Sequence, residues 1–395
     1  MPILIAIIVF GLVVLVHEVG HFVAARRAGI LVTEFAIGMG PKLFGFRRGE
    51  TLYTIRVLPL GGFCLMYNDD VDPLDRGDSL ADDALEDIDN SNIEDPFEDL
   101  MEDISDAHDV SFNSKTVSQR MSVMFAGSFM NFILAFILFS IVAWTSGFAT
   151  TTLMHVSPQS PAEAAGLAAG DRITSLNGSR IFLWNDIEFA INTGYGRPID
   201  VGFVRDGQHY SVNVTPTMVG ERYMVGIRPE VRVGVFVQPP PGFYRAGIGE
   251  SVVVGFMRIG FFIRATIVGL VQVITAQISA DQMAGPLGIV NMIGGEYQAA
   301  VAIAEEAQLS TALMILTVVI TMANFAALIS ANLGVLNLLP IPGLDGGRII
   351  FLVLEAIRRK PLPPEREGMV HLAGFVLLLV LIVFLTYQDI MNLLF

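Results

Sequence analysis

The stretch that decides the fold is the start of the chain, MPILIAIIVFGLVVLVHEVGHFVAARR (residues 1–27). Residues 1–25 are almost without interruption apolar. A helix of this length, rising about 1.5 Å per residue, crosses the roughly 30 Å hydrocarbon core of a bilayer. Arg26 and Arg27 follow the apolar run, so the positive-inside rule predicts that this end faces the cytoplasm and that Met1 lies outside. The segment lacks the basic start and the small-residue cleavage site of a signal peptide.

The composition of the 395 residues agrees with a membrane protein, because 53% are hydrophobic and only 16% are charged, whereas soluble domains average about 25% charged residues. The formal net charge of −15 argues against nucleic acid as a partner. A single cysteine, Cys64, excludes an internal disulfide framework and any cysteine-rich zinc or iron–sulfur site.

Further apolar segments at about 121–147, 311–339 and 369–387 predict three more transmembrane helices. Basic residues precede the first of these segments and fill the connection between the other two, so both connections are expected in the cytoplasm and both termini outside. Residues 252–278 are apolar as well, but Arg258 and Arg264 would each cost about 2.5–3.5 kcal/mol near the centre of a bilayer. This segment is therefore expected to be an amphipathic membrane-surface helix followed by a linker.

Three segments between the apolar ones are expected to lie outside the hydrocarbon core. Residues 34–67 alternate enough to predict a β-hairpin close to the membrane, and residues 152–235 contain short strands around turn signals such as Asn177-Gly178. Residues 68–110 hold 18 acidic residues against the single basic Arg76. Because such a block repels itself, we expect an acidic, disordered cytoplasmic insert.

The first apolar segment ends in His17-Glu18-Val19-Gly20-His21. Two histidines four positions apart lie on one face of a helix, so both rings can bind one metal ion. Glu18 is about 100° further round the helix, where its carboxylate can take a proton from a metal-bound water. Two histidines and a glutamate are costly in an apolar span unless they are paired or metal-bound, and the pattern therefore predicts a zinc site.

A third ligand is needed to complete such a site. The strongest candidate is Asp345, in the Pro/Gly-broken stretch Asn337-Leu-Leu-Pro-Ile-Pro-Gly-Leu-Asp-Gly-Gly at the cytoplasmic end of the third span, because irregular backbone at membrane depth is tolerated where it lines a wet cavity. His371, at the start of the fourth span, is a weaker candidate. The remaining histidines are poor candidates, because His108 lies in the acidic insert and His155 and His209 lie in the strand-rich segment 152–235, here called the outer module.

These residues together resemble the site-2 protease family of intramembrane zinc metalloproteases (M50), in particular its regulator-of-sigma-E protease (RseP-like) branch. The resemblance covers most of the chain and rests on several motifs. They are His17-Glu18-Val19-Gly20-His21, Gly38-Met-Gly-Pro41 through Pro59-Leu-Gly-Gly62, Ala126-Gly127…Asn131, Gly285-Pro-Leu-Gly-Ile289 and Asn337-Leu-Leu-Pro340…Leu344-Asp345-Gly346.

The resemblance implies zinc bound by His17, His21 and Asp345, with Glu18 as the general base. It also implies that Asn337 and Pro340 help to place the substrate, and that the hairpin pairs with an unwound substrate segment as an added strand. The outer module resembles a single PDZ domain through Ser160-Pro-Ala…Gly166-Leu…Gly170-Asp-Arg-Ile173. Members of this branch often have two such domains.

The expected fold is thus an α-helical polytopic membrane protein with four transmembrane helices, a membrane-associated β-hairpin and one extracytoplasmic PDZ (α+β) domain. The expected segments are residues 1–27 (first transmembrane helix with HExxH), 34–67 (hairpin), 68–110 (acidic insert), 120–147 (second transmembrane helix), 152–235 (PDZ domain), 250–300 (surface helix and linker), 311–359 (third transmembrane helix and the Leu-Asp-Gly region) and 366–390 (fourth transmembrane helix).

The family further implies a bacterial inner-membrane endopeptidase with its active site toward the cytoplasm. Its expected substrates are single-pass membrane proteins, such as anti-sigma factors or signal-peptide remnants, that an upstream site-1 type protease has cut first. Two other functions stay open at this point. A catalytically silent PDZ scaffold would need no acid–base residue such as Glu18, and a divalent-metal transporter would be expected to show internal repeats that this sequence lacks.

Overall fold

The structure is a computed structural model, and it describes residues 2–68, 110–220, 222–236, 239–275, 277, 284–360 and 362–394. The chain divides into two compact units, of which the first contains Met1–Leu134 and Ile278–Phe395 and the second contains Ala135–Gln277. Helix α3 (Val117–Ser146) contributes to both units. The predicted acidic insert lies outside the described residues, apart from its two end residues.

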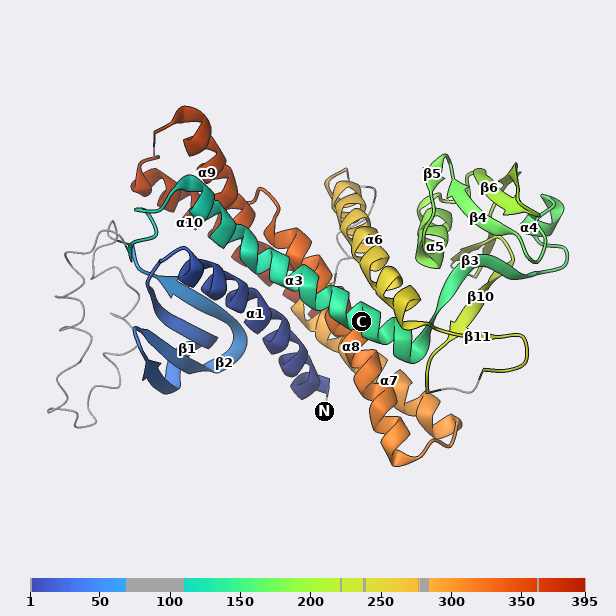
Figure 1. Ribbon diagram of the computed structural model, residues 1–395, viewed down its shortest axis with the longest axis horizontal. Coiled ribbons are helices and arrows are strands. Elements are labelled where there is room, and N and C mark those ends of the chain that lie inside the picture. The colour runs from blue at the N-terminus through green and yellow to red at the C-terminus, as the bar shows by residue number, and fades with distance from the viewer. Residues whose placement is uncertain are drawn as a thin grey trace, which may run out of the picture. The chain divides into compact units, whose positions relative to one another are not determined.

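The first unit is built mainly from helices that are apolar on most of their surface. Residues Ala6, Ile293 and Met322 lie in one buried cluster, which packs the first helix against two helices from the C-terminal half of the chain. Besides the N-terminal part of α3, the helices of this unit are α1 (Pro2–Arg27), α7 (Pro286–Glu306), α8 (Thr311–Asn337), α9 (Asp345–Arg358) and α10 (Pro364–Leu394) (Figure 1).

Among the described residues, six helices are long and apolar enough to cross a bilayer: α1, α3, α6 (Ile248–Ile274), α7, α8 and α10. The sequence predicted four spans, and the two additional candidates are α6 and α7. The linker expected before residue 300 is instead the 21-residue helix α7. Pro286 stands at its first turn, where its fixed φ favours a helix and its missing N–H costs nothing.

Strands β1 (Val32–Arg48) and β2 (Thr51–Met66) form a curved antiparallel sheet, here called the hairpin sheet, beside α1 (Figure 1). Each long strand bends back on itself, because Phe35 pairs with Cys64 on one side and with Tyr53 on the other. Tyr53 in turn also pairs with Phe46. The segments 61–66 and 42–48 are therefore the two edges of this sheet.

Two polar contacts fix the ends of the helices of this first unit. The guanidinium of Arg120, near the start of α3, forms a largely buried ion pair with Glu355 of α9. Near the end of α10, the buried carboxylate of Asp389 accepts hydrogen bonds from the backbone N–H groups of Gly285 (3.0 Å) and Gly288 (2.8 Å). Asp389 thus caps the first turn of α7, whose N–H groups have no partner within the helix.

The second unit contains a seven-stranded sheet, here called the module sheet, with strand order β11-β10-β3-β4-β6-β7 and β5 paired to β4. Its strands are β3 (Gly147–Val156), β4 (Arg172–Leu176), β5 (Ser179–Arg180), β6 (Ile199–Arg205), β7 (Gln208–Val214), β10 (Ile227–Val233) and β11 (Tyr244–Arg245). A separate pair, β8 (Thr217–Val219) and β9 (Arg222–Met224), and the helices α4 (Pro161–Ala164) and α5 (Trp184–Thr193) complete the module.

The module has a hydrophobic core of its own, to which Leu153, Ile173, Ile187 and Phe203 contribute from four different elements. Asn177 and Gly178 both adopt positive φ, as do Asp206 and Gly207. These turn residues connect β4 to β5 and β6 to β7, since two consecutive positive φ values match the twist of a tight hairpin.

Helix α6 belongs to this second unit and packs against the module. Val254 of α6 lies in a buried cluster with Ala143 and Leu183. Arg264 of α6 forms an ion pair with the buried Asp186 of α5, and the guanidinium of Arg258 lies 5.6 Å from the centre of the Phe139 ring. The two arginines that counted against a membrane span therefore have partners inside this unit.

Candidate metal centre

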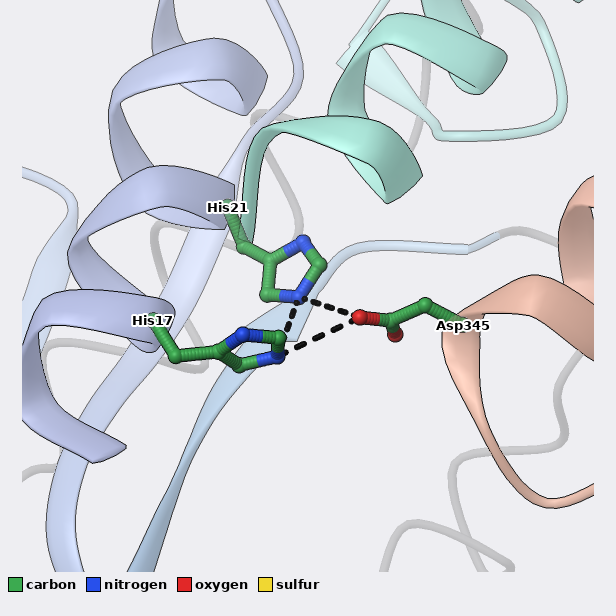
Figure 2. A group of neighbouring side chains, drawn as sticks. All are labelled: His17, His21 and Asp345. Carbon is green, nitrogen blue, oxygen red and sulfur yellow. Dashed lines mark hydrogen bonds and ion pairs between the residues drawn. The ribbon is translucent and has the colours of Figure 1, made fainter. Parts of the chain in front are cut away.

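The two histidines of the HExxH pattern project from one face of α1 toward the same point (Figure 2). Both are buried, with 7% of His17 and 6% of His21 exposed. Their rings meet edge to face, with 4.7 Å between the ring centres, and 3.1 Å separates His17 Nε2 from His21 Nε2. The helical spacing thus brings the two ring nitrogens within reach of one ion.

Asp345 reaches the same point from the first turn of α9, more than 300 residues further along the chain (Figure 2). Its Oδ2 atom lies 3.2 Å from His17 Nε2 and 3.2 Å from His21 Nε2. The three residues form the group whose ligand atoms all lie within 4.8 Å of one another. The structure therefore brings together the three predicted ligands.

The geometry of this group fits a zinc ion. Three ligand atoms about 2.0–2.2 Å from one tetrahedral ion lie roughly 3.3–3.6 Å from each other, and the observed separations of 3.1, 3.2 and 3.2 Å are close to that. Asp345 Oδ2 is buried and has no hydrogen-bond partner among the described residues. Two histidines and one carboxylate, with a fourth position left for water, are the donors of a catalytic zinc site.

Small residues allow α3 to pass close to the two histidines. A Cβ atom on Gly127 would lie 2.7 Å from His17 Cε1 and 2.8 Å from His21 Cε1, which is closer than real contacts allow. On the facing helix, a Cβ atom on Gly20 would lie 2.9 Å from Gly127 Cα. The Ala126-Gly127 motif is therefore a close helix crossing, of the kind that small residues make in membranes.

The crossing also places a backbone partner beside His21. His21 Nδ1 lies 2.9 Å from the carbonyl oxygen of Val123 in α3. Because a carbonyl only accepts, this contact puts the ring proton on Nδ1 and leaves Nε2 bare for a metal.

Glu18 is half-buried beside the three ligand residues, and its carboxylate interacts with the backbone N–H of Cys64 in the hairpin sheet. A Cβ atom on Gly62 would lie 3.3 Å from Glu18 Cγ, so the absence of a side chain at Gly62 lets the sheet edge approach. Burial, with the Glu18 carboxylate as a second cause, raises the pKa of the Cys64 thiol to about 12. Cys64 is therefore a protonated, unreactive neighbour of the site.

Of the two residues expected to place the substrate, Asn337 lies beside His17 and Pro340 lies in an exposed loop. Asn337 ends α8, and its Nδ2 atom lies 3.4 Å from His17 Nε2 and 3.5 Å from His17 Nδ1. Pro340 is exposed in the loop between α8 and α9. In that loop Gly343 adopts a φ of +95°, and a Cβ atom on Gly347 would lie 2.6 Å from the backbone oxygen of Ile341. The glycines thus let the loop fold tightly against the start of α9.

His371, the weaker candidate for third ligand, is outside the group. Its Nδ1 accepts a hydrogen bond of 3.0 Å from the backbone N–H of Gly343, two residues before Asp345, so it supports the ligand loop from α10. His108 lies outside the described residues, and His155 and His209 belong to β3 and β7 of the second unit. Sequence reasoning gave His371 no such role, because nothing in a local pattern identifies a backbone partner 28 residues away.

Asn131 is a further residue of the site to which the sequence assigned no role. Its side chain is fully buried in α3, and its Nδ2 atom lies 3.3 Å from His17 Nδ1. A polar amide in an apolar span is costly without a partner, and this cost is the signal that could have identified it.

The chain is similar to known zinc metalloproteases. The family model of peptidase family M50 matches residues 5–381. The zinc metalloprotease RasP of Geobacillus kaustophilus is 33% identical, and the match covers 97% of this chain and 96% of that protein. The regulator of sigma-W protease RasP of Bacillus subtilis is 32% identical, with 98% and 97% covered.

Among solved structures, the PDZ domain of an SdrC-like protein from Listeria monocytogenes matches 21% of this chain and 88% of its own, at 20% identity and a TM-score of 0.19. A TM-score this low does not establish a shared fold, so the PDZ domain stays a prediction. The family match, by contrast, spans nearly the whole chain, including all three residues of the metal centre. The chain belongs to peptidase family M50.

Proposed function

We propose that this protein is an intramembrane zinc endopeptidase that cuts single-pass membrane proteins. The observation that carries the proposal is the convergence of His17, His21 and Asp345 next to Glu18, within a bundle of apolar helices. The chain belongs to the metalloprotease family M50, and it has several apolar helices. Two relatives that match it over nearly their full length are named zinc metalloprotease and putative zinc metalloprotease. A third is named a regulator of sigma-W protease.

His17, His21 and Asp345 would hold the zinc ion, with His21 oriented by Val123. Zinc bound there would supply a polarised water, whose pKa falls to about 7, and would stabilise negative charge on the substrate carbonyl. Glu18 takes the proton from the attacking water and delivers it to the leaving amine. Asn337, within 3.5 Å of His17, helps to place the substrate carbonyl, and Pro340 helps to shape the loop beside it.

The hairpin sheet supplies the surface on which the substrate lies. In the described part of the chain, the edge 61–66 pairs with β1 on one side only, and the backbone N–H of Cys64 points to Glu18. An extended peptide added to this edge would make main-chain hydrogen bonds and bring a peptide bond close to the general base. A helical segment must unwind first, since its own turns shield the peptide bond.

The protein is a multi-pass membrane protein, and we assign four of the six candidate helices as spans: α1, α3, α8 and α10. Two observations favour α6 and α7 as helices at the membrane surface. Helix α6 pairs its Arg264 with the module, and α7 has a mean hydropathy of 1.2, against 2.2 to 2.7 for the other four. By the positive-inside rule, Arg26 and Arg27 support a metal centre that faces the cytoplasm, with both termini outside the inner membrane.

The module on β3 to β10 is proposed to be a PDZ domain on the extracytoplasmic side that selects substrates by size or chain end. Such a filter would restrict the enzyme to proteins that an upstream, site-1 type protease has already trimmed. Anti-sigma factors and signal-peptide remnants are substrates of this kind, and the name of the Bacillus subtilis relative, a regulator of sigma-W protease, agrees with the first.

The experiment uses the full-length protein in proteoliposomes with a single-pass substrate that has been shortened on its extracytoplasmic side. The wild type is expected to contain one zinc ion and to cut the substrate within its transmembrane segment. Glu18→Gln is expected to keep the zinc but to cut at least ~100-fold more slowly, because general acid–base catalysis contributes that much or more. His17→Ala is the matched variant that should lose both zinc and cleavage.

Equal cleavage by wild type and Glu18→Gln would contradict the proposal. Two results would favour the other functions instead. A wild-type protein that is purified without chelator, holds no zinc and cuts nothing would favour the scaffold. Zinc accumulation inside vesicles that depends on His17 but not on Glu18 would favour the transporter.

A further inference from the structure

The inference concerns Asn131, which lies on α3 one helical turn beyond the Gly127 crossing. None of its surface is exposed. Its backbone oxygen accepts a 2.8 Å hydrogen bond from the buried hydroxyl of Ser330 in α8, so its main chain is tied to a neighbouring helix. Its side-chain amide faces His17, with 3.3 Å between Asn131 Nδ2 and His17 Nδ1.

The tautomer of His17 decides which of the two groups donates the hydrogen bond in this contact. Its Nε2 faces Asp345 Oδ2 and His21 Nε2, so Nε2 must be bare when the residue binds a metal, and the ring proton then stands on Nδ1. A protonated Nδ1 needs an acceptor. In the structure, however, Nδ1 faces the NH₂ group of Asn131, which can only donate.

A second observation points the same way. Asn131 Oδ1 is buried and has no hydrogen-bond partner among the described residues. The oxygen and nitrogen of an amide are nearly equal in shape, so the choice between them follows from the hydrogen bonds. Turning the amide by 180° places Oδ1 toward His17 Nδ1 and converts two facing donors into one hydrogen bond.

Among the described residues, His17 Nδ1 has one other side-chain neighbour, Asn337, and this residue cannot replace Asn131. Asn337 Nδ2 lies 3.5 Å from His17 Nδ1 and 3.4 Å from His17 Nε2. An atom nearly equidistant from both ring nitrogens lies along the N–H direction of neither, whereas a hydrogen bond needs an angle near linear. Asn131 is therefore the residue placed to accept a hydrogen bond from the Nδ1–H of His17.

We propose that Asn131 is a positioning residue whose side-chain oxygen accepts a hydrogen bond from His17 Nδ1 and so fixes the tautomer and the plane of this ligand. Helix α3 then orients both histidines, His21 through the Val123 carbonyl and His17 through Asn131. Groups that orient a ligand in this way typically change metal affinity 10–100-fold when they are removed. The inference rests on the proposed zinc function.

The test measures zinc affinity by chelator competition in the purified full-length protein, in a Glu18→Gln background so that no proteolysis interferes. Asn131→Leu, which removes the acceptor at similar volume, is expected to weaken zinc binding 10–100-fold. Asn131→Asp, which offers an acceptor and, when ionised, no donor, is expected to keep zinc affinity within a few-fold of the parent. Cobalt in place of zinc should give an altered visible spectrum in Asn131→Leu only.

Ser330→Ala is the matched control, because it removes the hydrogen bond to the backbone of Asn131 and leaves the amide in place. Its zinc affinity is expected to equal that of the parent. Unchanged affinity and spectrum in Asn131→Leu would overturn the inference. So would equal losses in the Leu and Asp variants, which would make the amide a donor or a packing group, or a loss in Ser330→Ala as large as that in Asn131→Leu. A parent protein that binds no zinc would instead refute the proposed function itself.

Discussion

The hairpin sheet has an unpaired edge at 61–66, beside Glu18, whereas β3 in the module sheet is paired on both sides in the described residues, with β10 along one edge and β4 on the other. The pairing with β10 runs from Ile227 opposite Val156 to Val233 opposite Gly147, the full length of β3. A peptide can join the first sheet by strand addition, whereas β10 already occupies one edge of β3 along its full length.

The two sheets also differ in what covers their side chains. In the module, Ile199 and Phe203 of β6 are 2% and 3% exposed, because the module has its own core. At the outer edge of the hairpin sheet, Leu43 is 66% exposed and Phe44 is 61% exposed. Large apolar side chains left open in this way mark a surface that lipid or another protein covers. The apolar side chains at the outer edge of the hairpin sheet thus need a covering from outside the chain, whereas those of β6 are covered by the core of the module.

The largest effect is expected from the metal centre itself, which lies entirely in the unit of the hairpin sheet. Asp345→Ala removes one of three ligands, so zinc content should fall from about one ion to near zero and cleavage should disappear. Metal analysis and the proteoliposome assay measure both. The module should stay folded, with unchanged protection of its core amides in hydrogen exchange. Loss of that protection would mean that the two units depend on each other.

The second effect tests the chemistry of the hairpin edge. With its pKa raised to about 12, the Cys64 thiol is about 0.01% ionised at pH 8, and alkylation by a maleimide should be about 10³-fold slower than for an ordinary cysteine with a pKa near 8.5. The protein has no other cysteine. Labelling in detergent and in denaturant, followed by mass spectrometry, measures the difference. Equal rates in the two would show that the edge is more open than its burial indicates.

The third effect tests strand addition directly. Cys64→Pro removes the backbone N–H that points to Glu18, and proline is tolerated on an edge strand where the N–H faces outward. Cleavage should fall about 100-fold while zinc content stays the same, since substrate positioning is lost and the ligands are kept. Cys64→Ala keeps the N–H and should cut within a few-fold of the wild type. If the two variants behave alike, the substrate does not pair at this edge.

The smallest effect concerns the module. Ile187, on α5, is 1% exposed in the module core, and Ile187→Val should lower the free energy of unfolding of the module by about 1 kcal/mol. Hydrogen exchange of the core amides measures this. Zinc content and cleavage of an already shortened substrate should not change. A fall in zinc content would show that module stability reaches the metal centre.

The grouping of the three candidate ligands could be predicted because local sequence patterns indicate it. His17, Glu18 and His21 follow the period of a helix. Asp345 stands in a stretch broken by proline and glycine, and such irregular backbone is tolerated at membrane depth only where it is buried in protein or lines a wet cavity. The role of Asn131 could not be read in this way. Its partner is 114 residues away, and only the crossing of α1 and α3 brings the two together.

The sheets show the same limit. Alternation and turn residues predicted strands in 34–67 and 152–235, but they do not specify partners. That Phe35 would lie between Cys64 and Tyr53, or that β10 would cover β3, depends on bends and long-range pairings. Helix α7 was missed for another reason. Its Gly285-Pro286 start was taken as part of a linker, although proline in the first turn favours a helix.

The long sequence separation between the candidate ligands has a consequence for the synthesis of the protein. His17 and His21 leave the ribosome early, whereas Asp345 follows only after most of the chain has been made. Two histidines alone leave the ion poorly held. A nascent chain that has not yet reached Asp345 therefore lacks a complete ligand group and cannot yet act as a peptidase.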